Sequence, residues 1–364
     1  MRERAAPPPG AAGRARAALA RNRFALAGAA VLALLYTGAA LAPFLAPYAV
    51  DDLDTGHFFH PPMAVHWLAP GGGAPGRPYV FGVRLVDPGR LRYAEDRTVR
   101  LPLRLLVRGA RYRLLGVLPL DRHLLGVDAP GRLHLLGTDE QGRDELSLLL
   151  LGSQVSLTVG LVGILFSFSV GLVLGGLAGY LGGWVDALVM RTTELLLSVP
   201  ALYLVVAMRG ALPPALPVGG AYLLIVAILA FVGWAVIARV IRGMVLGIRR
   251  ADYVVAAEAL GMGRLRVLVR HILPNTMSFV VVAATLAVPA YILGEVFLSL
   301  LGYGVESSWG NMLQKSTSAE VMTTHPWVLF VPAVAIFVTV LAFNVLGDGL
   351  RDALDPRGLT GVER

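Results

Sequence analysis

The 364-residue chain has no cysteine, a single lysine and few charged residues of either sign. Without cysteine it can form no disulfide, no reactive thiol and no cysteine-ligated metal site. The lysine, Lys315, stands in LQKST and not behind a glycine-rich loop, so the chain lacks the phosphate-binding loop of an ATPase. HExxH and GxSxG motifs are also missing. We therefore predict a protein that is not an enzyme and that holds no cofactor or metal.

Charged residues make up only 15% of the chain, whereas a soluble domain has about 25%. Long runs without charge explain the difference, because most of them approach the ~20 residues that cross the hydrocarbon core of a bilayer. They predict an all-α polytopic membrane protein with six transmembrane helices. The predicted spans cover about 24–46, 153–180, 193–210, 219–241, 276–296 and 326–347.

The net charge of +8 comes almost wholly from arginine, and its distribution predicts the orientation. Seven arginines lie within 239–275, whereas the short loops 209–219 and 295–326 contain only Arg209 and Lys315. Short cytoplasmic loops are enriched in positive charge, so we expect 239–275 and both terminal tails, 1–23 and 348–364, inside the cell. The run 24–46 is longer than the apolar core of a signal peptide and is read as an uncleaved span. No tract interleaves basic and aromatic residues, so nucleic-acid binding is not expected.

The long outer segment 47–136 predicts a small β-rich domain, because short strand-like runs alternate with glycine, proline and aspartate. The runs are RPYVFGVRLV, VRLPLRLLVRG, RYRLLGVLPL and GRLHLLG, with a hairpin expected about Gly109 and Ala110. The domain is either a docking surface for a partner or a folded cap that braces the spans. His57, His60 and His66 are interpreted as loop histidines, since a Pro-Pro break between them and the lack of a nearby cluster of carboxylates or thiols argue against a metal site.

Residues 253–275 form an amphipathic stretch between two apolar runs. We predict a helix over 253–260 capped by Asp252, and a turn that begins at Gly261. A second short helix, RLRVLVRH, is expected to stop before Pro274. The apolar face predicted for the first helix consists of Tyr253, Val254, Ala257 and Leu260.

Two interpretations of this loop remain open. It could rest among lipid headgroups, or it could insert into the groove of a partner protein. The small side chains of Ala256, Ala257 and Ala259 favour close protein contact.

The spacing of Ala256-Ala257, Gly261 and Leu273-Pro274 resembles the EAA loop of permease subunits in binding-protein-dependent ABC importers. The resemblance implies that this segment is a coupling helix seated in a cleft of a cytoplasmic ATPase. The implied contact set is Tyr253, Val255, Ala256, Ala257, Glu258, Gly261, Leu273 and Pro274. Val255 stands where the family has its leading glutamate, and Glu258 follows one helical turn later.

Further blocks, kept in order along nearly the whole chain, resemble the C-type subunit of dipeptide/oligopeptide importers. They are LLGTDEQGRDELS, GSQVSLTVGL, GYLGGWVDALVMR, GEVFLSLLGYG, WGNML and NVLGDGLRDALDPR. The resemblance implies a type I importer fold in the bacterial plasma membrane, with an enlarged outer insertion. It also implies four kinds of partner: a B-type permease, two ATPase subunits that bind ATP and Mg, an extracytoplasmic binding protein, and a peptide substrate.

Two alternatives change the cargo or the energy source. The same architecture could import nickel or oligosaccharides. An ion-coupled secondary carrier would instead use Glu194 and Glu295, the acids nearest to the spans.

The remaining candidate residues divide into two sets. Pro200, Pro289 and Glu295 are candidates for the pathway or its gate, since proline opens helices and acids within a membrane are often functional. Glu295 would meet the amino group of the substrate or form a helix-end hydrogen bond. Structural ion pairs are expected among Asp139, Arg143 and Asp144 at the entry of the second span, and among Asp348, Arg351 and Asp352 after the last.

Overall fold

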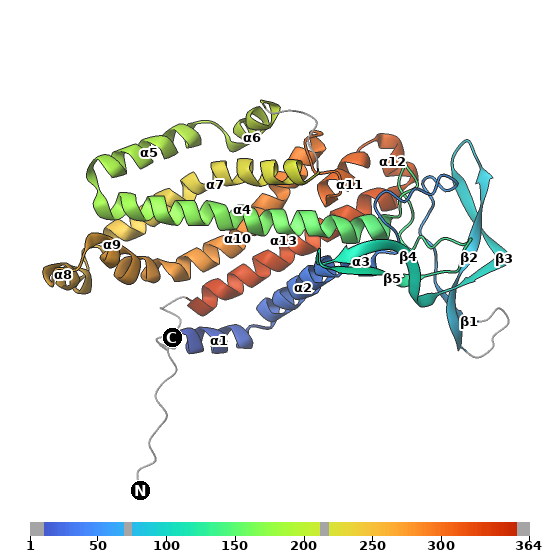
Figure 1. The fold of residues 1–364 in the computed structure, drawn as a ribbon, viewed down its shortest axis with the longest axis horizontal. Coiled ribbons are helices and arrows are strands. Elements are labelled where there is room, and N and C mark those ends of the chain that lie inside the picture. The colour runs from blue at the N-terminus through green and yellow to red at the C-terminus, as the bar shows by residue number, and fades with distance from the viewer. Residues whose placement is uncertain (1–10, 69–74, 212–217, 355–364) are drawn as a thin grey trace, which may run out of the picture.

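A computed structural model describes residues 11–68, 75–211 and 218–354. It is an elongated helical bundle with a β-rich part at one end and helix α8 at the other (Figure 1). We call these the β-rich end and the α8 end. The helices are α1 (Ala11–Arg21), α2 (Arg23–Ala40), α3 (Ala42–Leu45), α4 (Glu145–Leu181), α5 (Gly183–Ser198), α6 (Ala201–Gly210), α7 (Val218–Ile248), α8 (Asp252–Ala259), α9 (Arg264–Val267), η1 (Leu268–Ile272), α10 (Leu273–Leu300), α11 (Trp309–Lys315), α12 (Ala319–Thr324) and α13 (Pro326–Leu354).

Five helices of the described chain are long and apolar enough to cross a membrane. They are Arg23–Ala40, Glu145–Leu181, Gly219–Ile248, Arg264–Leu300 and Pro326–Leu354. This makes the protein a multi-pass membrane protein. Several of these helices extend beyond the predicted spans, so α4 begins at Glu145 and not near 153. Part of the predicted N-terminal tail is also helical, since 11–21 form α1, which packs against α13.

The predicted span 193–210 is not one straight helix. It falls on α5 and α6, which are bent by 87° at their junction. Pro200 explains the break, because its ring disfavours a helical conformation at the preceding residue and Val199 is indeed extended (φ −94°, ψ 129°). A sixth span exists only if this bent pair is counted as one.

Helices α4 and α7 pack along a row of three glycines spaced four residues apart on α4. A Cβ on Gly175 would lie 2.3 Å from the carbonyl oxygen of Ala238, and one on Gly179 would lie 2.8 Å from that of Arg242. At Gly171 it would lie 2.7 Å from Cβ of Ile237. Small residues at this spacing let helix backbones approach closely in a membrane. The glycine row therefore sets the distance between the two helices.

Replacing Gly175 by alanine should push α4 and α7 apart and destabilise the protein by about 1–3 kcal/mol, the usual cost of overpacking. The midpoint of thermal unfolding in detergent would fall accordingly. Gly247→Ala on α7 is the matched control, because a Cβ there meets no atom within 4 Å. Equal midpoints for the two variants would contradict the close packing.

The β-rich part consists of a three-stranded antiparallel sheet and a separate hairpin. The sheet has the order β1 (His66–Leu68), β2 (Pro75–Asp87) and β3 (Arg92–Pro102), and the hairpin pairs β4 (Arg104–Leu114) with β5 (Leu118–Gly126). The predicted strand over 131–137 is wrong, since this segment has no strand. Its Leu133 instead fills a small core with Val80 and Val127.

The predicted turn at Gly109 and Ala110 is also wrong, because both residues lie inside β4. The pairing of β4 with β5 becomes irregular between Arg108 and Tyr112. A Cβ at Gly109 would lie 2.6 Å from Cδ2 of His123, so the glycine marks a close approach within the strand pair. The chain reverses instead at 115–117.

Candidate functional site

Helix α8 projects at the end of the bundle opposite the β-rich part (Figure 1). It begins after Ala251, which makes no side-chain capping bond, so the prediction that Asp252 is the N-cap is wrong. Asp252 lies in the first turn, where its charge still favours the positive end of the helix dipole.

The helix ends in two backbone hydrogen bonds that Gly261 makes possible. The N–H of Gly261 donates to the carbonyl of Glu258 (2.9 Å), and that of Met262 donates to the carbonyl of Ala257 (3.2 Å). Gly261 has φ +79°, a left-handed conformation that glycine adopts without strain. This pattern is the Schellman motif, and it reverses the chain directly after α8.

The prediction that Pro274 ends the second short helix is wrong. The helix continues from α9 through the π-helical segment η1 into α10, and Pro274 occupies the first turn of α10. A π-helical segment accommodates the proline, because the N–H of Leu273 bonds to the carbonyl of Leu268 and the ladder is already displaced. The chain therefore passes from the α8 loop into a membrane-crossing helix without a break.

Only two residues of α8 are buried. Val254 is fully covered and Ala257 is 7% exposed, and both join the main core of the bundle. Tyr253 and Leu260, predicted on the same face, are 47% and 87% exposed. The predicted apolar face is therefore divided between an inner attachment and an outer surface.

Most of the predicted coupling residues lie on the exposed surface of α8 and its end, and two of them lie elsewhere. Tyr253, Val255, Ala256, Glu258 and Gly261 are exposed. Leu273 lies against Gly176 of α4, where its Cδ2 would be 3.1 Å from an added Cβ. Pro274 is exposed one residue further along α10. The sequence analysis did not single out Leu265, which is 67% exposed beside this loop. An apolar residue between two arginines was the signal that could have identified it.

A hollow of about 660 Å³ lies between α8 and the ends of α4 and α7. Glu258 forms one wall and accepts a hydrogen bond of 2.5 Å from the hydroxyl of Tyr180 on α4. Arg249, Arg250 and Arg264 line the same space, together with Val255. Three guanidinium groups and one carboxylate give the hollow an excess of positive charge, suited to an acidic partner surface.

An ion pair ties α5 to α7 near this end of the bundle. The guanidinium of Arg242 donates two hydrogen bonds of 2.5 Å to the carboxylate of Asp186. A bidentate pair fixes both distance and orientation. The sequence showed both residues but not that they would meet.

The three candidates for the pathway lie in different surroundings. Pro200 is at the corner between α5 and α6, and Pro289 is buried inside α10. Glu295 has no exposed surface, and one of its carboxylate oxygens accepts a 2.7 Å hydrogen bond from Ser299. Its Oε2 has no hydrogen-bond partner within the part of the chain that the structure describes. The segments that carry them do meet, because the residues next to them, Ala201, Ala290 and Gly294, line one apolar hollow of about 280 Å³.

The residues at the start of α4 form two connected polar groups. Arg143 donates from Nε to Oδ2 of Asp139 (2.8 Å), and Nη2 lies 2.5 Å from the same oxygen. Asp144 is the N-cap of α4, because its Oδ2 accepts from the backbone N–H (2.8 Å) and hydroxyl (2.7 Å) of Ser147. Asp348, Arg351 and Asp352 are exposed on α13 and form no ion pair among the residues described.

Asp144 also belongs to a buried group that the sequence did not reveal, the His134 cluster of His134, Asp54 and Asp144. The imidazole is 1% exposed, with Nδ1 3.1 Å from Oδ1 of Asp144 and Nε2 3.1 Å from Oδ2 of Asp54. A ring that faces a carboxylate on both sides carries a hydrogen on both nitrogens and is therefore positively charged. The cluster joins the segment after the first span to the cap of α4.

The charges of the cluster stabilise each other against burial. Burial opposes the charge on His134, but hydrogen bonds to Asp144 and Asp54 raise the pKa of its imidazole above the usual value. Burial likewise opposes the charge on Asp54, yet hydrogen bonds from His134 and His57 hold the pKa of that carboxyl below its usual range. Neighbouring His60 is buried beside the charged ring, and its pKa falls to about 4.

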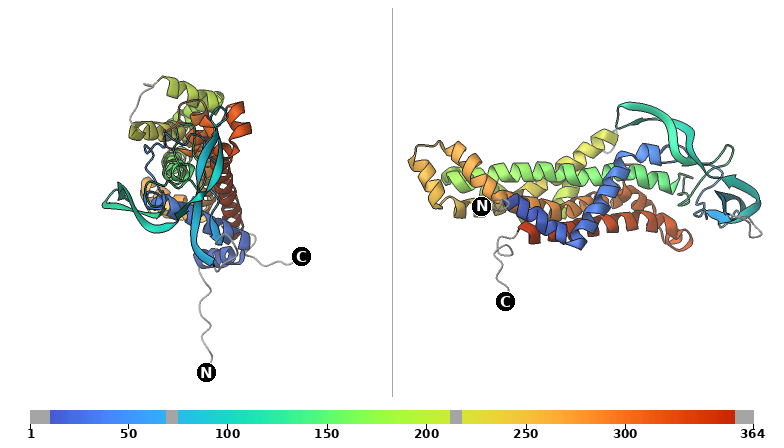
Figure 2. Two further views of the ribbon diagram at one scale, coloured as in Figure 1. Left: turned by 90° about the vertical axis from the view of Figure 1, so that its right-hand side faces the viewer. Right: turned by 90° about the horizontal axis from the view of Figure 1, so that it is seen from below.

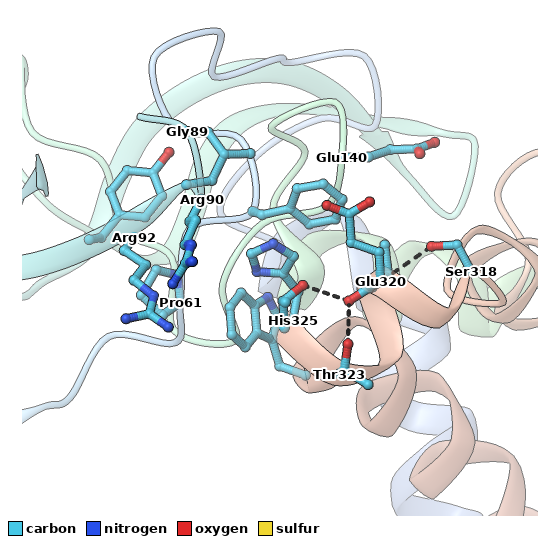
Figure 3. A pocket seen from close by; sticks show the side chains of 15 residues that line it. Pro61, Gly89, Arg90, Arg92, Glu140, Ser318, Glu320, Thr323 and His325 are labelled. Carbon is cyan, nitrogen blue, oxygen red and sulfur yellow. Dashed lines mark hydrogen bonds between the residues drawn. The ribbon is translucent and has the colours of Figure 1, made fainter. Parts of the chain in front are cut away.

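A second hollow, of about 870 Å³, opens at the β-rich end between the β2–β3 turn and α12 (Figure 3). Arg90 and Arg92 stand on one side, and Glu140 and Glu320 stand on the other. Between them the ring of His325 stacks on Phe59 at 4.3 Å. The two sides therefore carry opposite charge around an aromatic floor.

The sequence matches two protein families. Residues 171–358 match the family described as binding-protein-dependent transport system inner membrane component. The chain belongs to this family. Residues 12–62 match the N-terminal transmembrane domain of oligopeptide transport permease C.

Relatives of known name agree with this assignment. The chain is 41% identical over 209 residues to the dipeptide transport system permease protein DppC of Bacillus subtilis, covering 57% of this chain and 63% of the relative. It is 39% identical over 209 residues to the oligopeptide transport system permease protein OppC of the same organism, covering 57% and 66%. These matches span less than two thirds of either Bacillus relative. OppC of Mycobacterium tuberculosis is 30% identical over 339 residues, 92% of this chain and 91% of the relative.

Proposed function

We propose that this chain is the C-type permease subunit of an ATP-driven importer for dipeptides and oligopeptides. Family membership and the names of the relatives support a transport role. The observation that carries the mechanism is α8, a short helix attached through Val254 and Ala257 whose outer surface has no covering within the described chain. A partner ATPase would seat this surface in a cleft, and its closure would move α8.

The proposed arrangement in the membrane follows from the same features. We place the α8 end and both termini in the cytoplasm of a bacterial cell, and the β-rich end outside the plasma membrane. The bent pair α5 and α6 would serve as the sixth span. A B-type permease would supply the second half of the pathway, and an extracytoplasmic binding protein would deliver the peptide. ATP and Mg would be bound by two ATPase subunits.

An ion-coupled carrier fits the described residues less well. Glu194 is half exposed and pairs with Arg191 on α5 at 3.0 Å, so its charge is already matched outside the bundle core. Glu295 has no exposed surface within the described part of the chain. Neither acid lies in an accessible path of the kind that a coupled ion needs.

Uptake into proteoliposomes tests the proposal. The chain would be co-purified with a second permease and ATPases, and uptake of a radiolabelled tripeptide would be followed with the binding protein present. We expect uptake to require ATP and to survive a protonophore. Uptake that persists with an inactive ATPase but collapses with the proton gradient would establish the carrier instead, and competition by nickel or an oligosaccharide but not by peptide would change the cargo.

Restoring the family glutamate by Val255→Glu is expected to change ATP-driven uptake by no more than about twofold. The new carboxylate would enter a hollow lined by Arg249, Arg250 and Arg264, whose positive charge offsets the modest repulsion from Glu258. The control is Val254→Glu, which buries a charge one residue away and should prevent folding. A loss of uptake in a well-folded Val255→Glu protein would mean that the partner cleft is fitted to valine.

A further inference from the structure

The β4–β5 hairpin stands apart from the rest of the β-rich part. It pairs with no strand of the three-stranded sheet, and a two-stranded hairpin alone is only marginally stable in water. One attachment is His123, whose Nδ1 lies 2.6 Å from the carbonyl oxygen of Ala46, just after α3, and another is Leu125, which packs on the small core around Leu133. The hairpin is thus fixed at the point where the first membrane-crossing helix ends, and the rest of it needs other support.

The turn of the hairpin is aliphatic and exposed. Leu115 and Val117 flank Gly116 and are 68% and 77% exposed, and Leu118 and Leu120 continue the apolar surface. Hairpin turns in water are usually built from asparagine, aspartate, glycine and serine. Leu115 also has φ +52°, a conformation that β-turns normally give to those residues. An apolar side chain at this position points to an apolar surrounding.

Arginines follow the turn along both strands. Arg108 lies directly opposite Arg122 in the strand register, and Arg111 and Arg113 lie between them and the turn. Like charges opposite each other destabilise a strand pair. Within the described residues none of these four has an ion pair, and Asp121 is the one acid among them. The middle of the hairpin is therefore an unmatched cationic surface.

The position of the hairpin relates these two surfaces to the membrane. Figures 1 and 2 show it running back along the long axis, so that its turn lies level with the β-rich ends of α2 and α7. It also stands out to the side of the bundle in Figure 2. The aliphatic turn is thus level with the ends of two apolar helices, and the arginines lie one step further toward the β-rich end. Hydrocarbon followed by phosphate is the order of groups in a lipid leaflet.

We propose that the β4–β5 hairpin is a lipid anchor for the β-rich end. Its turn enters the hydrocarbon edge of the adjacent leaflet, and the guanidinium groups of Arg108, Arg113 and Arg122 bind the phosphates of anionic phospholipids. Arginine suits this contact, because its planar group donates two hydrogen bonds to phosphate oxygens. A protein partner is less favoured, since protein interfaces usually centre on tryptophan, tyrosine and arginine and this turn has only aliphatic side chains.

The natural absence of cysteine makes the test direct. Val117→Cys would carry an environment-sensitive fluorophore in the full-length chain, reconstituted in nanodiscs of phosphatidylethanolamine and phosphatidylglycerol. Val99→Cys on β3, 46% exposed, is the control in the sheet. Lipid spin-labelled near the top of its acyl chain should quench the label at 117 and not at 99, and iodide should do the reverse. Iodide quenching at both sites, without lipid quenching, would overturn the proposal.

Two further arms separate charge from apolar contact and lipid from protein. In nanodiscs of phosphatidylcholine, or with Arg108→Gln and Arg122→Gln together, the ratio of inserted to aqueous label should fall at least about fivefold, since each arginine near an anionic surface contributes ~1 kcal/mol. An unchanged ratio would remove the phosphate contact from the proposal. Lipid quenching should also persist when the second permease is reconstituted with the chain. If that subunit abolished the quenching, the hairpin would be a protein interface and the lipid anchor would be wrong.

Discussion

Replacing His134 by alanine is expected to cost about 3–5 kcal/mol, the usual result of removing one partner from a buried set of charges. The carboxylates of Asp54 and Asp144 would then lose the buried cation between them. Because Asp144 caps α4, the loss would loosen both the β-rich end and the first turn of that helix. Thermal unfolding and protease sensitivity near residues 128–134 would measure it.

The control for this variant is His66→Ala. His66 is one third exposed and lies 3.7 Å from Glu95, and such a surface pair contributes only about 0–1 kcal/mol. Equal unfolding midpoints for the two alanine variants would show that the His134 cluster does not hold the two segments together.

The same cluster predicts how stability depends on pH. The pKa of His134 is raised in the folded protein, so its contribution is complete below the ordinary value of ~6.5 and disappears as the pH rises through the raised value. The lowered pKa of Asp54 acts at the opposite end, where its contribution is lost only in strong acid. Arg132 stays charged and His60 and Tyr48 stay neutral across this range. The stability difference between the native protein and His134→Gln should therefore shrink from pH 6 to pH 10.

Leu260→Arg should abolish ATP-driven uptake while leaving the fold intact. The side chain is 87% exposed at the end of α8, so the substitution disturbs no packing within the described chain. On the proposed coupling surface it would replace an apolar anchor by a long cation that the partner cleft would have to bury. Burying an unmatched charge at an interface costs several kcal/mol, enough to reduce coupling by more than about a hundredfold.

Leu53→Arg is the matched control, since this leucine is also exposed (47%) but follows α3 at the β-rich end, opposite α8. Uptake and co-purification of the ATPase would be measured for both. We expect the ATPase to be lost with Leu260→Arg alone. Normal uptake by that variant would exclude α8 as the site of coupling.

Much of the architecture could be predicted because it depends on local patterns. Long apolar runs gave the membrane-crossing helices, and Gly261 marked the end of α8 because its φ is one that glycine readily adopts. The bend at Pro200 was visible as a proline but not as a corner of 87°, since the angle depends on what α6 packs against. The prediction that a helix stops before Pro274 was wrong for a related reason, because a π-helical segment can accommodate a proline that would end an ordinary helix.

The candidate sites were less predictable because they depend on contacts distant in sequence. His134 meets Asp54 across 80 residues, and Tyr180 meets Glu258 across 78. No spacing rule connects such pairs. The turn at Gly109 failed differently, since glycine at a close approach within a strand pair resembles glycine in a turn.

The glycine row on α4 has a mechanical consequence. With a carbonyl 2.3 Å from where a Cβ of Gly175 would be, α4 and α7 have no clearance to slide or tilt against each other. Arg242 adds α5 to the same block through Asp186, and α7 leads almost directly into α8. A force on α8 would therefore move α4, α5 and α7 together as one rigid unit. Beyond the corner at Pro200, Val205 of α6 shares a core cluster with Ile225 and Val226 of α7, so α6 would follow the same movement.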